Sequence, residues 1–139
     1  MTEIVIDASV ALAWCFRDEL TEAITGLLDW LQSNTAAVPT LWPLEVANVL
    51  ALAERRRRIT AAESAQLIAL LGTLDIVVDP EAPARALTGI LDLAREERLT
   101  VYDSAYLELA MRLGVPLASK DRELCDAAER VGVTVLRAG

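Results

Sequence analysis

The stretch IVIDASVALAW, residues 4–14, joins a short apolar run to an amphipathic segment, and Asp7 stands at the junction. The aliphatic, β-branched residues before Asp7 predict a strand, and the alanine-rich residues after it predict a helix. No basic residue lies within nine positions of Asp7. The stretch therefore predicts a buried strand that ends on a carboxylate without a nearby cation.

The same pattern of strand, small polar residue and carboxylate recurs in VPLASKDREL, residues 115–124, where Asp121 takes the place of Asp7. Short apolar runs bounded by Asp, Pro, Thr or Gly predict strands at 3–6, 37–39, 76–78, 116–118 and 133–136. Amphipathic patterns predict helices at 8–16, 21–33, 43–57, 61–73, 82–97, 103–113 and 121–131.

Strands that alternate with helices pair in parallel through right-handed crossovers, which predicts a three-layer α/β fold with a central parallel sheet of about five strands. The helices at 43–57 and 61–73 have no strand between them and are expected to form a projecting helical hairpin. The chain shows no repeat, no low-complexity segment and no linker. We therefore expect one domain over residues 1–139.

The composition and the first residues argue against a membrane-spanning or secreted protein. Although 54% of the residues are hydrophobic, no segment has the ~20 consecutive apolar residues of a membrane span. The first residues lack the basic n-region of a signal peptide, which favours a soluble, cytoplasmic protein. The apolar fraction exceeds what one small domain usually buries and suggests a second chain as partner.

The reactive side chains that are present limit the chemistry. Cys15 and Cys125 match no metal-ligand spacing and lie in apolar helical patterns, so we interpret them as core residues. Histidine is absent, which excludes Ser-His-Asp and Cys-His sites and zinc held by histidine. Any catalysis must depend on carboxylates, hydroxyls, lysine and arginine.

Two further acids begin apolar helical stripes. Glu45 lies in WPLEVANVL, residues 42–50, and Asp103 lies in YDSAYLELA, residues 102–110. The stripe that begins at Glu45 continues through Asn48, Val49 and Leu52. Because ligands bind beyond the carboxyl ends of parallel strands, these acids are expected to approach Asp7 and Asp121 there.

Helix capping is the alternative interpretation for each acid taken singly, because Asp is favoured at helix N-termini. Four acids on or near inward faces are harder to explain as caps, since clustered carboxylates repel each other and are costly to bury. A divalent cation removes this conflict. Mg²⁺ and Mn²⁺ prefer oxygen ligands and retain waters that substrate phosphates can replace.

Four motifs, in this order and spacing, resemble the signatures of PIN-domain ribonucleases, and in particular the small VapC-type toxins of toxin–antitoxin pairs. They are IVIDASV, PLEVANVL, YDSAYLELA and ASKDRELCDAA, at residues 4–10, 43–50, 102–110 and 118–128. The resemblance covers the chain from about Ile4 to Leu136. It implies a PIN fold and a metal-dependent endoribonuclease that leaves a 5′-phosphate and a 3′-hydroxyl.

The resemblance also implies the residues of the site. The catalytic, metal-binding acids would be Asp7, Glu45, Asp103 and Asp121, supported by Ser9, Asn48 and Ser119. Asp126 is ranked below Asp121 because it lies a turn and a half farther along the terminal helix. The implied cofactor is Mg²⁺, with Mn²⁺ as a substitute, and the implied partners are RNA, a VapB-type antitoxin and a second copy of the chain.

The net charge of −8 opposes binding to a polyanion, but four of the negative charges belong to the proposed site, where cations would neutralise them. Contacts with substrate phosphates could come from Arg55, Arg56, Arg57, Arg58 and Lys120. The alternative for the arginine run is a solvated helix end whose cations complement the helix dipole.

Two other functions fit parts of the sequence. A receiver-like phosphotransfer module would use Asp79, which ends DIVVDP at residues 75–80, as the phosphate acceptor. That class needs an acceptor on a central strand and an acidic pair after the first strand, whereas Asp7 is a single acid. A catalytically silent PIN-like interaction domain is the other alternative, although all four acids are present.

Overall fold

The structure is a computed structural model and describes residues 3–139. Its elements follow in the order β1 (Glu3–Ile6), α1 (Ala8–Ala13), η1 (Arg17–Glu19), α2 (Glu22–Leu31), β2 (Thr35–Pro39), α3 (Trp42–Arg55), α4 (Ala61–Gly72), β3 (Asp75–Asp79), α5 (Ala82–Arg85), η2 (Ala86–Ile90), α6 (Leu91–Glu97), α7 (Val101–Leu113), β4 (Leu117–Ser119), α8 (Arg122–Arg130) and β5 (Val135–Arg137).

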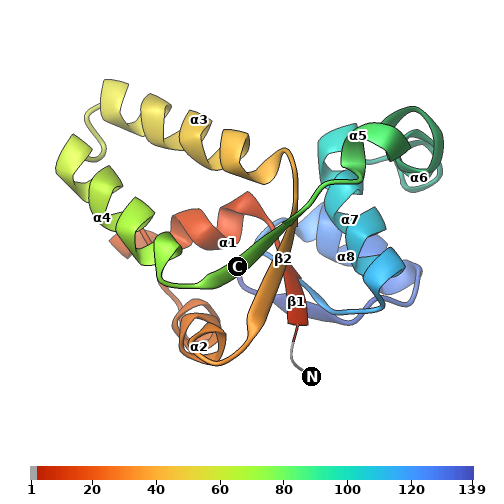
Figure 1. The fold of residues 1–139 in the computed structure, drawn as a ribbon, viewed down its shortest axis with the longest axis horizontal. Helices are drawn as coiled ribbons and strands as arrows, with labels where there is room; N and C mark the ends of the chain where they lie inside the picture. Colours follow the sequence, from red (N-terminus) through yellow and green to blue (C-terminus); the bar gives the residue numbers. More distant parts are fainter. Residues whose placement is uncertain (1–2) are drawn as a thin grey trace.

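The strands form one parallel sheet in the order β3-β2-β1-β4-β5. Figure 1 shows this sheet between two groups of helices, with α1 to α4 on one side and α5 to α8 on the other. The α3–α4 hairpin extends away from the sheet, as the sequence predicts. The expected three-layer α/β fold is therefore confirmed.

The sheet is most deeply buried at its centre because the apolar runs there face helices on both sides. Val5 and Ile6 in β1 are fully buried, as are Leu117 and Ala118 in β4. By contrast β3 lies at the edge, and its Val77 is 49% exposed. The central strand β1 is the one that ends on Asp7, so this carboxylate lies at the middle of the sheet.

Local signals place the helix ends as expected. Thr60 and Glu63 form a reciprocal capping box at the start of α4. Thr100 caps α7, and Gly114 ends it with φ of +68°, a left-handed conformation that glycine adopts without strain. These signals fix the orientation of α7, which carries Asp103 at its amino-terminal end.

Most helices lie within two residues of their predicted bounds, but two differ more. The helix predicted at 8–16 ends at Ala13 and is followed by the 3-10 turn η1. The helix predicted at 82–97 is interrupted by a π-helical turn, η2, between α5 and α6. In both regions the apolar pattern continues past the interruption, so periodicity alone does not reveal it.

The inward face of α3 also differs from the expected stripe. Its buried residues are Trp42, Val46, Leu50 and Ala53. Asn48 is exposed, whereas Glu45 is partly buried at the border of this face. The correction is one helical position, because the stripe through Trp42 contains the bulkier apolar side chains and takes the core.

No helix within residues 3–139 has the length and apolar character that crossing a lipid bilayer requires.

Candidate active site

The four acids predicted from the sequence lie around the carboxyl ends of β1 and β4. Asp7 follows β1, Asp121 follows β4 by two residues, and Glu45 and Asp103 lie in the first turns of α3 and α7. Parallel strands direct their carboxyl ends to the same edge of the sheet, which is why segments so distant in sequence meet there.

Asp7 is the most buried of the four, with 5% of its surface exposed. One carboxylate oxygen accepts hydrogen bonds from Ser9 Oγ at 2.6 Å and from the Val10 amide at 3.2 Å. The other accepts from Ser119 Oγ at 2.5 Å. Burial nevertheless raises the pKa of Asp7 above its ordinary value, and repulsion from Asp121 adds to the effect.

Ser119 connects the two strand-end acids. Its hydroxyl donates to Asp7 and accepts a hydrogen bond from the Asp121 amide at 2.9 Å. The Asp121 carboxylate caps α8 by accepting from the Leu124 amide at 3.0 Å, and it is exposed to solvent. Ser9 and Ser119 thus hold Asp7 from two sides. Asn48, predicted as a third supporting residue, is exposed and lies one turn beyond Glu45.

Glu45 is held by a side chain from another helix. The hydroxyl of Tyr106 on α7 donates a short hydrogen bond to Glu45 Oε1. Burial raises the pKa of Glu45, as does the charge of Asp7. Burial and the Glu45 hydrogen bond both raise the pKa of Tyr106, so its hydroxyl stays protonated and donates. Tyr106 follows Asp103 by three residues on α7, and this spacing is the signal that could have revealed it.

The charges of all three other acids affect the pKa of Asp103. Its pKa is raised to about 6, first by burial and then by the charges of Asp121, Asp7 and Glu45. The helix cap at this end of α7 is Thr100, so Asp103 is not the N-cap residue that the alternative interpretation requires. The other three carboxylates therefore lie near enough for their charges to act on Asp103, and the four are called the acid cluster below.

The cluster carries negative charge without a compensating cation. Among residues 3–139, none of the four acids forms an ion pair with lysine or arginine. In the same part of the chain, no three Asp, Glu or Cys side chains converge closely enough to hold a metal ion directly. The donors therefore fit a hard cation such as Mg²⁺, which is commonly held by one or two carboxylates and keeps several waters.

Asp126 and the predicted phosphate contacts lie elsewhere. Asp126 accepts a hydrogen bond from Arg137 at 2.6 Å, outside the cluster. Arg55, Arg56 and Arg57 are exposed at the carboxyl-terminal end of α3, opposite Glu45. Arg58 and Lys120 both form ion pairs with Glu19. The structure thus brings Lys120 beside the acids, joins Arg58 to Lys120 through Glu19, and leaves Arg55, Arg56 and Arg57 at the far end of α3.

Asp79 does not have the surroundings of a phosphate acceptor. It ends β3, which is the edge strand of the sheet. Arg112 binds its two oxygens at 3.0 and 3.1 Å and lowers its pKa against the opposing effect of burial. The receiver-like alternative requires an acceptor on a central strand, so the structure contradicts it.

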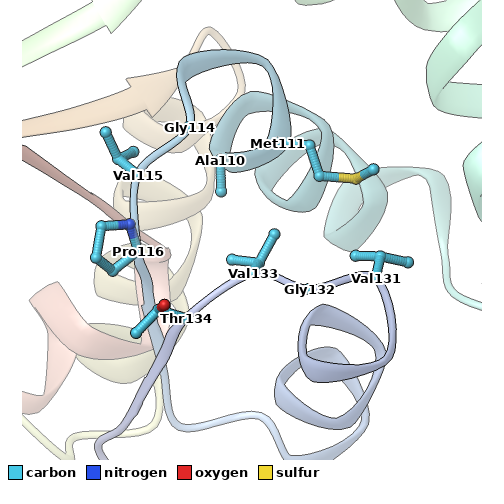
Figure 2. Close-up of a pocket in the computed structure, with 9 residues that line it drawn as sticks. All are labelled: Ala110, Met111, Gly114, Val115, Pro116, Val131, Gly132, Val133 and Thr134. Atoms are coloured by element: carbon cyan, nitrogen blue, oxygen red, sulfur yellow. The ribbon is translucent and has the colours of Figure 1, made fainter.

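A concave region lies at the opposite ends of the strands, away from the four acids. Figure 2 shows it between the end of α7 and the segments that lead into β4 and β5. Its lining consists of small and apolar residues, including Met111, Pro116 and Val133, with Thr134 as the polar exception. Without an acid or a base in its lining, it offers no catalytic group.

Replacement of Asp103 by Asn should make the metal-free protein more stable above pH 6. Because the native pKa of about 6 exceeds the ordinary 3.8, the folded state binds more protons between these values, and stability falls as pH rises through that window. Removing the charge should raise the free energy of unfolding at pH 8 by about 1 kcal/mol after allowance for solvent screening.

Urea unfolding in EDTA at pH 4 and pH 8 tests this expectation. The gain should be present at pH 8 and absent at pH 4. Asp126→Asn is the control, because the Arg137 hydrogen bond lowers the pKa of Asp126 and its loss should give no gain at pH 8. A loss of stability in Asp103→Asn at both pH values would show that the acids do not repel one another.

Comparison with known proteins agrees with this arrangement. The family described as "PIN domain" matches residues 4–130. Ribonuclease VapC3 of Pyrobaculum aerophilum is 28% identical over 124 residues, which cover 89% of this chain and 93% of that protein.

Two solved structures have a similar fold. The crystal structure of PAE2754 from Pyrobaculum aerophilum has a TM-score of 0.68 and 27% identity, and the match covers 96% of this chain and 90% of that one. FitAcB from Neisseria gonorrhoeae has a TM-score of 0.67 and 18% identity over 97% of each chain. At 18% identity, the second likeness shows the fold alone.

Proposed function

Because this chain belongs to the PIN domain family, we propose that it is a metal-dependent endoribonuclease that hydrolyses RNA phosphodiester bonds. The observation that carries the proposal is the set of four carboxylates at the carboxyl ends of the central strands, none of which pairs with a cation within residues 3–139. The name of the similar Ribonuclease VapC3 supports RNA as the substrate. All four acids are retained, which argues against a catalytically silent interaction domain.

Some residues of the site would bind Mg²⁺ or Mn²⁺ and the attacking water, and others would orient those ligands. Of Asp7, Glu45, Asp103 and Asp121, one or two would bind the ion directly and the others through its water ligands. The ion, when bound, makes water a better nucleophile and offsets charge that develops on the phosphate. Ser9 and Ser119 fix the orientation of the Asp7 oxygens, and Tyr106 fixes that of Glu45. The products would carry 5′-phosphate and 3′-hydroxyl ends.

The similarity to Ribonuclease VapC3 also suggests which partners the chain would bind. We propose that the chain acts in the cytoplasm as the toxin of a VapBC-type pair, inhibited by a VapB-type antitoxin, and that it forms a homodimer. The similarity to a protein named VapC3 supports this role. Exposed apolar side chains, among them Leu44, Leu87 and Tyr102, support the presence of surfaces that a partner covers.

Cleavage of RNA by the purified chain tests the activity. With Mg²⁺ or Mn²⁺, single-stranded RNA should be cut, and EDTA should abolish the reaction until excess Mg²⁺ restores it. The fragments should accept tails from poly(A) polymerase, which requires 3′-hydroxyl ends. A mock purification without the protein controls for contaminating ribonucleases, many of which need no metal. Cleavage by the chain that persists in EDTA would contradict the metal-dependent mechanism.

A further inference from the structure

One carboxylate outside the cluster joins two cations from distant parts of the chain. Glu19 Oε1 accepts a hydrogen bond from Lys120 Nζ at 2.6 Å, and its Oε2 accepts one from Arg58 Nη2 at 2.8 Å. Glu19 ends η1, Arg58 lies in the turn between α3 and α4, and Lys120 lies between β4 and α8. Three separate connections thus meet at one anion.

The guanidinium of Arg58 and the backbone of Lys120 are each held in place by further contacts. The Arg58 guanidinium lies over the ring of buried Phe16, 3.8 Å from its centroid, and also contacts Asp18 at 3.3 Å. The Lys120 amide donates to Ser9 Oγ at 3.1 Å, and that hydroxyl donates to Asp7 at 2.6 Å. The backbone of Lys120 is therefore two hydrogen bonds from the most buried acid of the proposed active site.

We infer that Lys120 and Arg58 form a binding site for one backbone phosphate of the RNA, next to the scissile bond, and that Glu19 fills this site in the unbound protein. The inference rests on the proposed function, since it assigns the contact to the substrate of the same site. A phosphate offers what Glu19 offers, namely negative charge and two oxygens that an ammonium and a guanidinium can share.

Exposure and charge make the exchange feasible. The side chains of Glu19 and Lys120 are 27% and 20% exposed, and that of Arg58 is 45% exposed, so a phosphate can reach all three. Partly exposed ion pairs contribute little to stability, so their replacement by equivalent pairs costs little. Burial opposes the ionisation of Glu19, yet the hydrogen bonds from Lys120 and Arg58 hold its pKa below the ordinary value. Glu19 is thus a charged competitor for the phosphate.

Binding of a fluorescein-labelled single-stranded RNA of roughly 12 nucleotides tests this inference. Anisotropy is measured at several salt concentrations in an Asp7→Asn background, which suppresses cleavage. Glu19→Gln should bind the RNA roughly threefold to tenfold more tightly at about 50 mM salt, because Lys120 loses its competing carboxylate and Arg58 keeps only the exposed Asp18. Adding Lys120→Gln to Glu19→Gln should remove the gain.

Glu96→Gln is the matched control, since it removes the same charge from an exposed position on α6. Its binding should stay close to that of the parent. If Glu19→Gln does not fold, Lys120→Gln alone provides the test. It should make the plot of log affinity against log salt less steep by about 0.7, the value for one lost phosphate contact on a single strand. Arg95→Gln, on α6, is the control for this loss of a positive charge.

The outcomes separate this inference from the proposed function. If the wild-type chain cleaves RNA with Mg²⁺ but Glu19→Gln binds no more tightly than Glu96→Gln, the inference is overturned and the activity stands. An equal salt dependence for Lys120→Gln and Arg95→Gln overturns it as well. If the chain neither binds nor cleaves RNA, both fail.

Discussion

Replacement of Asp7 by Asn is expected to lower the rate of RNA cleavage by roughly 10²–10⁴-fold, the equivalent of several kcal/mol of transition-state stabilisation. Asp7 is the buried acid at the end of the central strand, and hydroxyls of Ser9 and Ser119 hold its two oxygens. Asn keeps the shape and accepts hydrogen bonds through one oxygen, but it removes the charge that would attract a cation.

The fold should tolerate this substitution. Burial and Asp121 raise the pKa of Asp7, so its negative charge does not favour the metal-free folded state. Circular dichroism and thermal unfolding of Asp7→Asn should therefore resemble those of the wild type.

The control for this experiment is Asp126→Asn, which removes the same charge from a carboxylate outside the candidate site. Asp126 pairs with Arg137 and lies outside the cluster, so cleavage should stay within about twofold of the wild-type rate. If Asp7→Asn cleaves RNA as fast as Asp126→Asn, with both proteins folded, Asp7 has no part in catalysis. Loss of activity in both variants would instead place Asp126 in the site.

The sequence predicts this fold well because its strands are short apolar runs with clear punctuation. The five predicted strands coincide with β1 to β5 to within two residues at each end. The candidate acids could also be predicted from the sequence, because they lie near the ends of predicted strands or helices, and ligands bind at the carboxyl ends of parallel strands. What periodicity could not show is where a helix stops despite a continuing apolar pattern, as it does after Ala13.

Contacts between distant residues were beyond the reach of local patterns. Arg58 belongs to a run of arginines that a helix end explains as well as a phosphate site does. Only the folded chain shows that Arg58 stacks on Phe16 and pairs with Glu19 while its neighbours remain exposed. The Tyr106–Glu45 hydrogen bond likewise joins two helices that begin far apart in sequence.

The second large effect expected is on metal binding itself. Burial and neighbouring carboxylate charges raise the pKa of Asp7, Glu45 and Asp103. Together with Asp121 these acids have no cation paired to them within residues 3–139, so they should bind a divalent ion more tightly than any other acidic group of that region. Since no three of them converge closely enough to surround an ion, water should complete its coordination. We expect removal of two of these charges, in Asp7→Asn/Asp103→Asn, to weaken binding at least about tenfold.

Electron paramagnetic resonance of free Mn²⁺, titrated with the RNA-free protein near neutral pH, tests the central claim most directly. The wild type and Asp126→Asn should remove Mn²⁺ signal with the same affinity, competitively with Mg²⁺, whereas Asp7→Asn/Asp103→Asn should remove almost none at equal concentration. Equal Mn²⁺ binding by the double variant and the wild type would contradict the assignment of the cation site to these carboxylates.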